Sequence, residues 1–434
     1  MKFFLLLFVF TSAAFYGKGI VNVKHYGAKG NGSTDDYVAI HLAIKALHTQ
    51  KTGTLYFPAG NYRVSKFMDA LGTAQDFIFK DIANVELIGE GAKISLSGDF
   101  TRKADRVKGK YSYSNLSHLS FVFRNVENLK ISGLEIDGGA HSTRRVGKIA
   151  ESRGRLLSFS DCKNVILENL HIHHALADAI YITGKSCSFT GNNLLLENNA
   201  RQGMSIIQLV GGKFTNSTFA RSGQTGNYGG HSPMAGVDIE PTFENPGVRD
   251  VLFDNCTFED NLGSQLVISA PEKTSNILVK NSNILVKSSK SPYSVILSGS
   301  GIVLENNLID TGIGSIYPLW GKFKNSIVTL KGNHIKSRGR GILSHDKSNT
   351  NKIFIIGNTI EYNGSETIAS YFPYILKADS FINNSIIIPE KKLKNKGVVS
   401  LINNVNSVKN NKFLNEKGKE MFVNTSFKNS KLLD

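Results

Sequence analysis

The sequence predicts an all-β fold, a single-stranded right-handed parallel β-helix of about ten coils with an N-terminal capping helix. Short apolar runs, each interrupted by Asn or Gly, recur about every 25 residues, and a fixed period of this length indicates stacked units. Each run alternates with a period of two and is rich in Ile, Val, Leu and Phe, which predicts strands. The clearest copies begin at Asn128, Asn164, Val251, Asn276, Ile302, Ile327 and Ile353.

The Asn and Gly residues between paired runs explain how short strands become a coil. These residue types adopt left-handed backbone conformations that other residues enter only at a cost. One coil cannot bury its inner face, whereas a stack forms a continuous core in which every strand pairs with the coils above and below. An all-β sandwich is the competing arrangement, but it would show hairpin turns and varied strand lengths.

One elongated domain is predicted over residues 20–434, because no Pro-rich or Ser-rich linker interrupts the repeat. Residues 1–19 are predicted to be a signal peptide, since Lys2 is followed by an apolar run at 3–10 and small residues at 12–14. We therefore expect a secreted protein, extracellular or periplasmic. The apolar run is too short to span a membrane, and no later run of about 18 apolar residues follows.

The net charge is +16, from 51 Lys and Arg against 35 Asp and Glu. An exported protein with this excess is expected to meet an anionic partner. Nucleic acid is not expected, because no helix-turn-helix, zinc-finger or RRM-like signature is present, so an acidic polysaccharide is favoured. The alternative is that abundant Lys and Asn reflect only the composition of a genome.

The three cysteines, Cys162, Cys187 and Cys256, lie within the strand pattern. We expect buried thiols that fill the core, with a disulfide between neighbouring coils as the alternative. Their odd number leaves at least one thiol unpaired in either case.

The segment before the repeat predicts a cap. Asp35 and Asp36 would cap an amphipathic helix over residues 37–47, and this helix would close the open end of the solenoid, whose strand edge would otherwise recruit other chains. Two motifs of this segment carry a family resemblance, Tyr26-Gly-Ala-Lys-Gly-Asn-Gly-Ser-Thr-Asp-Asp36 and Gly53-Thr-Leu-Tyr-Phe-Pro-Ala-Gly-Asn-Tyr-Arg-Val64.

These motifs resemble the opening of pectate-lyase-like β-helix proteins. That superfamily includes rhamnogalacturonases, polygalacturonases, alginate epimerases and phage tailspikes. The resemblance implies the fold and leaves the chemistry open, because members hydrolyse, eliminate, epimerise or only bind. The polygalacturonase motifs Asn-Thr-Asp and Asp-Asp are not matched, since Ala177-Asp178-Ala179 stands in the first place. A polygalacturonase activity is therefore not implied.

A functional patch is predicted within residues 178–240, where successive strands can be aligned. In this alignment alternate residues point into the core, and their neighbours Tyr181, Ser205, Asp238 and Val267 form one outward column. The aligned strands are residues 178–182, 202–206, 235–240 and 264–268.

Asp238 and Glu240 are the leading candidates for general acid and base. They flank the core residue Ile239, so both carboxylates stand on the solvent face of one strand, roughly 6.5 to 7 Å apart. That spacing lies at the lower edge of the range of inverting glycosidases, about 6.5 to 9.5 Å. Like charges this close also raise one pKa, as a general acid requires. Asp178 would complete the cluster two coils away, roughly 10 Å along the axis.

Residues around this patch are predicted to bind substrate. Arg201 would either neutralise the carboxylates or grip a sugar carboxylate or sulfate. Gly203 and Gly236 would leave a trough for a sugar chain, or else they only open sharp bends. The predicted substrate-binding set is Arg201, Gln202, His173, Tyr181, Ser205, His231 and Lys185.

Two surplus segments are expected to form loops on the binding face, where insertions in a solenoid often lie. Residues 222–234 lead directly into Asp238 and bring His231 as an acid-base group. Residues 138–155 carry several Arg and Lys residues. They would form a basic wall for an anionic chain, or else solvated loop charges with no ligand.

The leading functional prediction is a secreted glycoside hydrolase that acts on an anionic polysaccharide. Asp178, Asp238 and Glu240 would be its acid-base residues. The alternatives are a polysaccharide lyase and a noncatalytic adhesin or spike-like binder.

In the lyase alternative, the three carboxylates would hold Ca²⁺ against a uronate carboxylate. Arg201, Lys185 or His173 would then remove the C5 proton, although an ordinary exposed strand face and a surface lysine also explain His173 and Lys185. No cofactor besides this Ca²⁺ is expected. The capped ends of the solenoid indicate a monomer.

Overall fold

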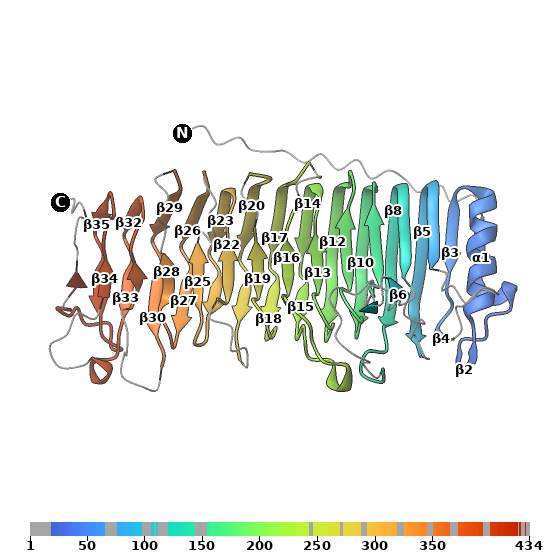
Figure 1. The fold of residues 1–434 in the computed structure, drawn as a ribbon, viewed down its shortest axis with the longest axis horizontal. Coiled ribbons are helices and arrows are strands. Elements are labelled where there is room, and N and C mark those ends of the chain that lie inside the picture. The colour runs from blue at the N-terminus through green and yellow to red at the C-terminus, as the bar shows by residue number, and fades with distance from the viewer. Residues whose placement is uncertain are drawn as a thin grey trace.

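The computed structural model shows one elongated stack of coils, seen along its length in Figure 1. Helix α1 (Tyr37–Gln50) closes one end of the stack, and the C-terminal strands lie at the other end. The structure describes residues 19–65, 76–97, 106–107, 110–111, 120–143, 154–242, 246–269, 272–287, 293–318, 325–344, 350–364, 372–393, 400–423, 425–426 and 430.

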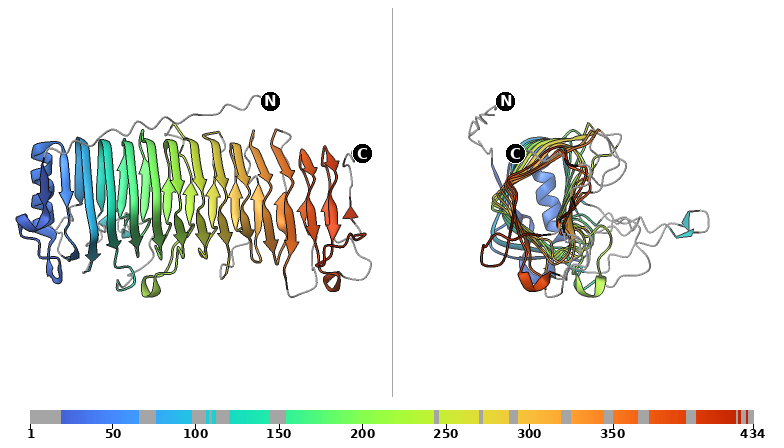
Figure 2. Two further views of the ribbon diagram at one scale, coloured as in Figure 1. Left: turned by 180° about the vertical axis from the view of Figure 1, so that it is seen from behind. Right: turned by 90° about the vertical axis from the view of Figure 1, so that its left-hand side faces the viewer.

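The coils superpose on one another around a common interior, as the end-on view in Figure 2 shows. The coils after the first contribute strands to three parallel ladders, so the predicted parallel β-helix is confirmed. The elements outside the ladders are the 3₁₀ turns η1 (Val23–Tyr26), η3 (Gly226–Tyr228) and η4 (Glu390–Lys392), and the antiparallel pair β6 (Arg106–Val107) and β7 (Lys110–Tyr111).

Ladder 1 starts beneath α1 and contains fourteen strands in the part of the chain that the structure describes. The stack therefore has more coils than the ten predicted. The prediction is too low because the first and last strands carry only weak copies of the repeat. The strands are β1 (Ile20–Asn22), β3 (Gly53–Tyr56), β5 (Phe77–Leu96), β8 (Phe121–Asp137), β10 (Lys163–His173), β12 (Cys187–Glu197), β14 (Leu209–Thr215), β17 (Val248–Asp254), β20 (Thr274–Lys280), β23 (Ser300–Glu305), β26 (Ile327–Lys331), β29 (Lys352–Ile356), β32 (Ser380–Ile382) and β35 (Val408–Lys409).

Ladder 2 follows ladder 1 in each coil. The C-terminal halves of β5, β8, β10 and β12 belong to it, because these long strands bend from one ladder into the next. Its other strands are β2 (Asn31–Asp35), β4 (Gly60–Val64), β15 (Thr218–Ala220), β18 (Thr257–Glu259), β21 (Asn283–Leu285), β24 (Leu308–Asp310), β27 (His334–Ser337), β30 (Thr359–Tyr362), β33 (Ser385–Ile387) and β36 (Lys412–Leu414).

Ladder 3 completes the coil and carries the predicted patch. It begins with the N-terminal parts of β5 and β8. Its other strands are β9 (Leu157–Ser160), β11 (Ile180–Thr183), β13 (Met204–Ile206), β16 (Val237–Ile239), β19 (Leu266–Ile268), β22 (Val295–Leu297), β25 (Ser315–Pro318), β28 (Gly341–Ser344), β31 (Tyr374–Ile375), β34 (Ser400–Ile402) and β37 (Thr425–Ser426).

The bend between ladders 1 and 2 is made by Asn, as predicted. Asn169, Asn193 and Asn216 have φ values of 53°, 52° and 52°, which lie in the left-handed region that Asn tolerates better than most residues. The side chain of Asn193 donates to that of Asn169 at 2.8 Å. The residue that turns one coil therefore also bonds to the coil below.

Stacked aromatic rings fill the interior of the first coils. Phe79 and Phe123 lie with ring centroids 4.8 Å apart, and Phe123 and Phe159 lie 5.0 Å apart. All three are fully buried. Offset ring stacking adds to the free energy gained by removing these side chains from water.

Helix α1 covers the end of this core, but its N-terminus differs from the prediction. The Tyr37 N–H is bound by the side chain of Asp35 at 3.0 Å. Asp36 instead accepts hydrogen bonds from the backbone of Lys29 and Gly30, at 2.6 and 3.0 Å. Asp36 therefore ties the preceding loop to the helix, and Asp35 satisfies the helix end.

The cysteines are all free thiols, so the predicted disulfide alternative is wrong. Cys162 and Cys256 are buried as expected, and burial raises the pKa of both thiols to about 11. Cys187 is only partly buried. Within the described ranges, no helix has both the length and the apolar character needed to cross a bilayer.

A column of buried amides stabilises the C-terminal half of the stack. Asn333 accepts from both the backbone and the side chain of Asn307, at 3.0 and 2.9 Å. Its own amide donates to the Leu304 carbonyl at 2.8 Å and to Asn358 at 3.0 Å. The same pattern repeats one coil later at Asn358, so each amide joins successive coils where water cannot compete.

Replacing Asn333 with Ala should lower the free energy of unfolding by about 3 kcal/mol, because buried donors and a buried carbonyl lose their partners. Urea unfolding followed by circular dichroism measures the change. The control is Asn325→Gly, an exposed position with φ 62° that Gly accommodates, expected within about 0.5 kcal/mol of wild type. Equal unfolding midpoints for Asn333→Ala and wild type would contradict the stabilising role.

Candidate active site

The candidate site lies on the outer face of ladder 3, at the ends of β11, β13 and β16. The predicted alignment is confirmed residue by residue: Tyr181 pairs with Ser205, Ser205 with Asp238, and Asp238 with Val267. Since partners in a parallel ladder point the same way, these side chains form one column. The tight turns before each strand bring further polar residues to the same place.

Asp178 is fully buried just before β11 and acts as an anchor for two arginines. Arg201 Nη1 lies 3.1 Å and 3.3 Å from the two carboxylate oxygens. Arg155 Nε lies 3.9 Å from the same carboxylate. The Asp178 side chain has no exposed area, whereas those of Arg155 and Arg201 are 32% and 18% exposed. The surface of the site is therefore cationic, with the anionic group beneath it.

Asp238 is held by a chain of hydrogen bonds that crosses the column. Arg201 donates to the side-chain oxygen of Gln202 at 2.9 Å, and the Ser205 hydroxyl donates to the same oxygen. These two donors orient the Gln202 amide, so its nitrogen donates to Oδ2 of Asp238. Oδ1 of Asp238 is buried and has no hydrogen-bond partner among the residues that the structure describes.

The environment of Asp238 favours its neutral form. Burial raises the pKa of Asp238 to about 7, and repulsion from Glu240 contributes, against the opposing attraction of Arg201. Glu240 follows β16 and is exposed, and its backbone N–H binds the Ile206 carbonyl at 3.1 Å. The two carboxyl groups therefore differ in solvent contact although they are two residues apart.

Tyr181 and Arg155 pack against each other beside this network. The Arg155 guanidinium carbon lies 3.3 Å from the centroid of the Tyr181 ring, an attractive cation–π arrangement. Arg155 comes from the end of the basic segment 138–155. Residues 144–153 of that segment lie outside the described residues, so the predicted basic wall is represented here by Arg155.

The surplus loop 222–234 packs against the coils rather than standing open. His231 is buried, and its Nε2 lies 3.0 Å from the Leu176 carbonyl of a lower coil. Tyr228 is part of the buried core. His231 therefore holds the loop against the stack, next to the turn that contains Asp178.

The glycines of the column do not form the predicted trough. A Cβ atom on Gly203 would lie 2.6 Å from the Gly236 carbonyl oxygen, and one on Gly236 would lie 2.6 Å from the Gln265 carbonyl oxygen. Such distances are too short for any side chain. Both glycines are therefore required by close backbone packing between coils.

Two predicted residues lie away from this cluster. Lys185 is exposed in the turn after β11, where its backbone N–H binds the Asp161 carboxylate at 2.9 Å. His173 lies at the end of β10 on ladder 2, where its Nε2 is 3.1 Å from Glu135. The structure therefore brings together Asp178, Asp238, Glu240, Arg201, Gln202, Ser205 and Tyr181, and places His173 in a second cluster.

This second cluster, on ladder 2, is not among the sites predicted from the sequence. His171 pairs with Glu135 and His173 with Asp137 in the ladder register, and Lys93 bonds to both acids at 2.8 and 3.0 Å. The signal was present, because Glu-Ile-Asp at 135–137 and His-Ile-His at 171–173 occupy equivalent places in neighbouring coils.

Charge and burial act against each other in the ladder 2 cluster. Burial, then the neighbouring His173 and His141, lowers the pKa of His174 to about 4. Burial also lowers the pKa of His173, against the attraction of Asp137. Burial opposes the charge of Lys93, but hydrogen bonds to Glu135 and Asp137 raise its pKa overall. Burial therefore disfavours the charged forms of His173 and His174, whereas the two carboxylates favour the charged form of Lys93.

The chain was compared with known proteins. Residues 20–292 match the model of the family described as rhamnogalacturonase A/epimerase, pectate lyase-like. The chain is 28% identical over 210 residues to alginate lyase 7 of Azotobacter vinelandii, covering 47% of this chain and 23% of that protein. It is 47% identical over 70 residues to mannuronan C5-epimerase AlgE6 of the same organism, covering 16% and 8%. The chain thus spans under a quarter of the length of either relative.

The solved structure of the pre-mature bacteriophage phi29 gene product 12 is similar in fold. The TM-score is 0.56 with 17% sequence identity, and the match covers 93% of this chain and 57% of that one. At this identity the likeness concerns the fold alone. The chemistry of the site has to be argued from its own residues.

Replacing Asp238 with Asn should stabilise the protein above neutral pH. The folded-state pKa of about 7 lies above the ordinary value of 3.8, so the folded state retains a proton that the unfolded chain releases. Stability from this group is complete below about pH 4 and is lost as the pH rises through about 7. The variant does not lose this stability, so above neutral pH its free energy of unfolding should exceed that of wild type by at most about 4 kcal/mol.

Thermal unfolding at pH 5 and pH 8 tests this expectation. The melting temperature of Asp238→Asn should rise relative to wild type between the two pH values. The matched control is Asp250→Asn, at an exposed position where Asn keeps the acceptor for Asn276. A difference between Asp238→Asn and wild type that does not change with pH would show that Asp238 is ionised in the folded protein.

Proposed function

The chain belongs to the rhamnogalacturonase A/epimerase, pectate lyase-like family, and from this premise we propose that it is an exported enzyme that hydrolyses glycosidic bonds of an anionic polysaccharide. The alginate lyase and mannuronan epimerase among its relatives support a polysaccharide of acidic sugars as substrate. The excess of positive charge on the chain supports the same class of substrate.

The observation that carries this proposal is the pair Asp238 and Glu240. Burial and the Glu240 charge raise the pKa of Asp238 to about 7, while Glu240 is exposed at the end of the same strand. A buried carboxyl with a raised pKa beside an exposed carboxyl is the arrangement expected of a general acid and a general base.

The hydrogen bonds of Asp238 determine which oxygen carries its proton. Gln202 donates to Oδ2, so Oδ2 acts as an acceptor and the proton of the neutral carboxyl lies on Oδ1. Oδ1 is also the oxygen without a protein partner. In the proposed reaction it donates the proton to the glycosidic oxygen, and Glu240 takes a proton from the water that attacks the anomeric carbon. Because Asp238 is buried, sugar binding must displace the side chains that cover it.

The arginines supply the specificity for an acidic sugar. Asp178 anchors Arg201 by two contacts and lies near Arg155, and the side chains of both arginines reach the surface. Guanidinium groups bind carboxylates and sulfates in a bidentate manner. Asp178 therefore positions the arginines in this proposal, and the Tyr181 ring packs against the Arg155 guanidinium and helps to hold it.

β-Elimination is the second candidate, and the two arginines favour it. Lyases must neutralise a uronate carboxylate before a base removes the neighbouring proton, and Arg155 with Arg201 can do so. A Ca²⁺ ion in this position does not fit the residues present, because the Asp178 oxygens already face the two guanidinium groups. Elimination at this site would therefore be arginine-assisted.

An activity screen on pectins, alginate and sulfated galactans distinguishes the candidates. Reducing ends and ultraviolet absorbance are followed together, since elimination creates an absorbing unsaturated product and hydrolysis does not. Asp238→Asn and Glu240→Gln should each lower the turnover by at least about 100-fold, while the matched control Asp250→Asn should leave it unchanged. Ultraviolet absorbance would support elimination, and the absence of both signals on every substrate would support a binding protein.

The pH dependence of hydrolysis should follow the acid. Because the reaction uses protonated Asp238, kcat/KM should fall about tenfold per pH unit above a pKa near 7. Initial rates between pH 5 and pH 9 measure this limb. A profile that is flat across pH 7 would rule out Asp238 as the general acid, whatever the effect of its substitution.

A further inference from the structure

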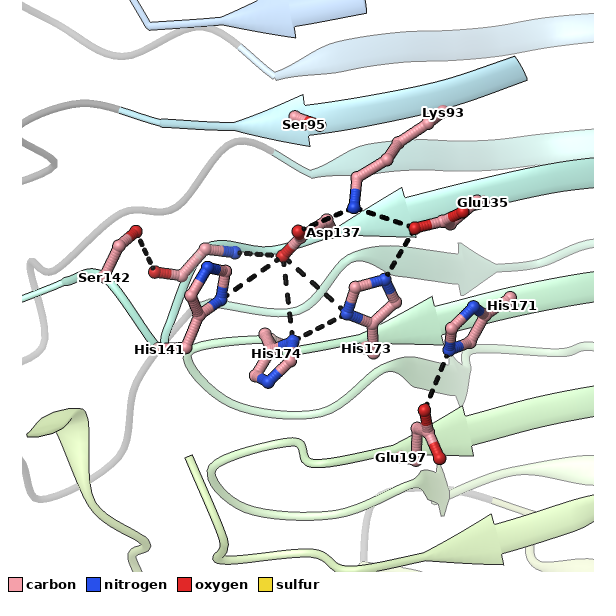
Figure 3. Close-up of polar contacts among 12 residues, drawn as sticks. Lys93, Ser95, Glu135, Asp137, His141, Ser142, His171, His173, His174 and Glu197 are labelled. Carbon is pink, nitrogen blue, oxygen red and sulfur yellow. Dashed lines mark hydrogen bonds and ion pairs between the residues drawn. The ribbon is translucent and has the colours of Figure 1, made fainter. Parts of the chain in front are cut away.

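Four possible ligand atoms face one another in the ladder 2 cluster, as Figure 3 shows. Oδ1 of Asp137 lies 3.7 Å from Nδ1 of His141 and 3.7 Å from Nδ1 of His173. It lies 3.8 Å from Nδ1 of His174. The Nδ1 atoms of His173 and His174 are 2.6 Å apart. Three imidazoles from two different coils thus direct the same ring atom at one carboxylate oxygen.

These separations resemble those between metal ligands. The distances from Asp137 to the imidazoles exceed the usual range of an N–H···O hydrogen bond, about 2.7 to 3.2 Å. Two ligands of a tetrahedral zinc ion, each about 2.0 to 2.1 Å from the metal, lie about 3.3 Å apart. The observed separations lie on both sides of that value, and the donor atoms of Asp137, His141 and His174 all lie within 4.8 Å of one another.

We propose that Asp137, His141, His173 and His174 bind one divalent transition-metal ion of the zinc type. Three imidazoles and a carboxylate suit such an ion, whereas Ca²⁺ and Mg²⁺ prefer oxygen ligands. The proposal concerns a site on ladder 2 and depends on no part of the proposed hydrolysis on ladder 3.

The residues behind these ligands orient them as an outer shell does in metal sites. His173 Nε2 lies 3.1 Å from Glu135 Oε1. A carboxylate only accepts, so Nε2 carries the hydrogen and the lone pair of Nδ1 faces the proposed ion. Lys93 lies 2.8 Å from Glu135 and 3.0 Å from the other oxygen of Asp137. Both carboxylates are therefore fixed from the side opposite the metal.

The backbone at Gly138 and Gly139 explains how His141 reaches the site. A Cβ atom on Gly138 would lie 2.5 Å from the His174 carbonyl oxygen, and Gly139 has a φ of +72°. The turn therefore packs directly on the next coil, and the rings of His141 and His174 lie 4.5 Å apart. His141 is about half exposed, so the ion can enter the site from that side.

A neighbouring triad of Glu135, His171 and His173 also has its atoms close together. His171 Nε2 lies 3.0 Å from Glu197, and Oε1 of Glu135 already accepts from both Lys93 and His173. We therefore assign the ion to the Asp137 set, and His171 lies outside it.

Titration calorimetry of the full chain, stripped with a chelator, with ZnCl₂ tests the site. We expect one ion per chain, and the Co²⁺ form should show the intense visible absorption of a tetrahedral ion. His141→Ala, in an exposed turn that should still fold, should weaken binding at least about 10-fold, and Asp137→Asn likewise.

Two controls make the outcome decisive. His171→Ala should bind Zn²⁺ as wild type does, and so should His334→Ala, which removes a half-exposed imidazole far along the stack. The proposal is overturned if wild type takes up no Zn²⁺, or if binding survives in His141→Ala and Asp137→Asn. Loss of binding in His171→Ala alone would place the ion in the other triad and would also overturn it.

Discussion

Parallel pairing of each coil with the coils before and after it is the constraint on which the rest of this structure depends. The pairing satisfies the backbone of every inner strand, and it also repeats the position of each side chain one coil later. Ser205 therefore stands beside Asp238, and His173 stands beside Asp137. A functional site in such a fold is a column, built from single residues of several coils.

The two clusters arrange their charged side chains in opposite ways. On ladder 3 the carboxylate of Asp178 is buried and the arginines above it reach the surface, so an anionic ligand meets cations first. On ladder 2 the carboxylates of Glu135 and Asp137 are held by Lys93, and three imidazoles face one oxygen of Asp137. The first arrangement suits an acidic sugar, and the second suits a metal ion.

The same constraint limits which residues tolerate change. Where backbones of successive coils approach closely, as at Gly203 and Gly236, no side chain fits. Where an amide such as Asn333 crosses between coils, its loss exposes no surface but leaves buried groups unsatisfied. The stack is therefore intolerant of substitution at its turns, even at positions that have no chemical role.

The periodicity of the sequence by itself determined the strands, the parallel stack, the capping helix and the outward column that contains Asp238. These follow from alternation and repeat length, which are local properties of the chain. Only the tertiary structure decided that Asp238 is buried, that Arg155 reaches Asp178, and that His141 meets His174. Those features depend on atoms from turns of variable length and from other coils. Alternation shows which face of a strand a side chain occupies, but not which groups of other segments cover that side chain.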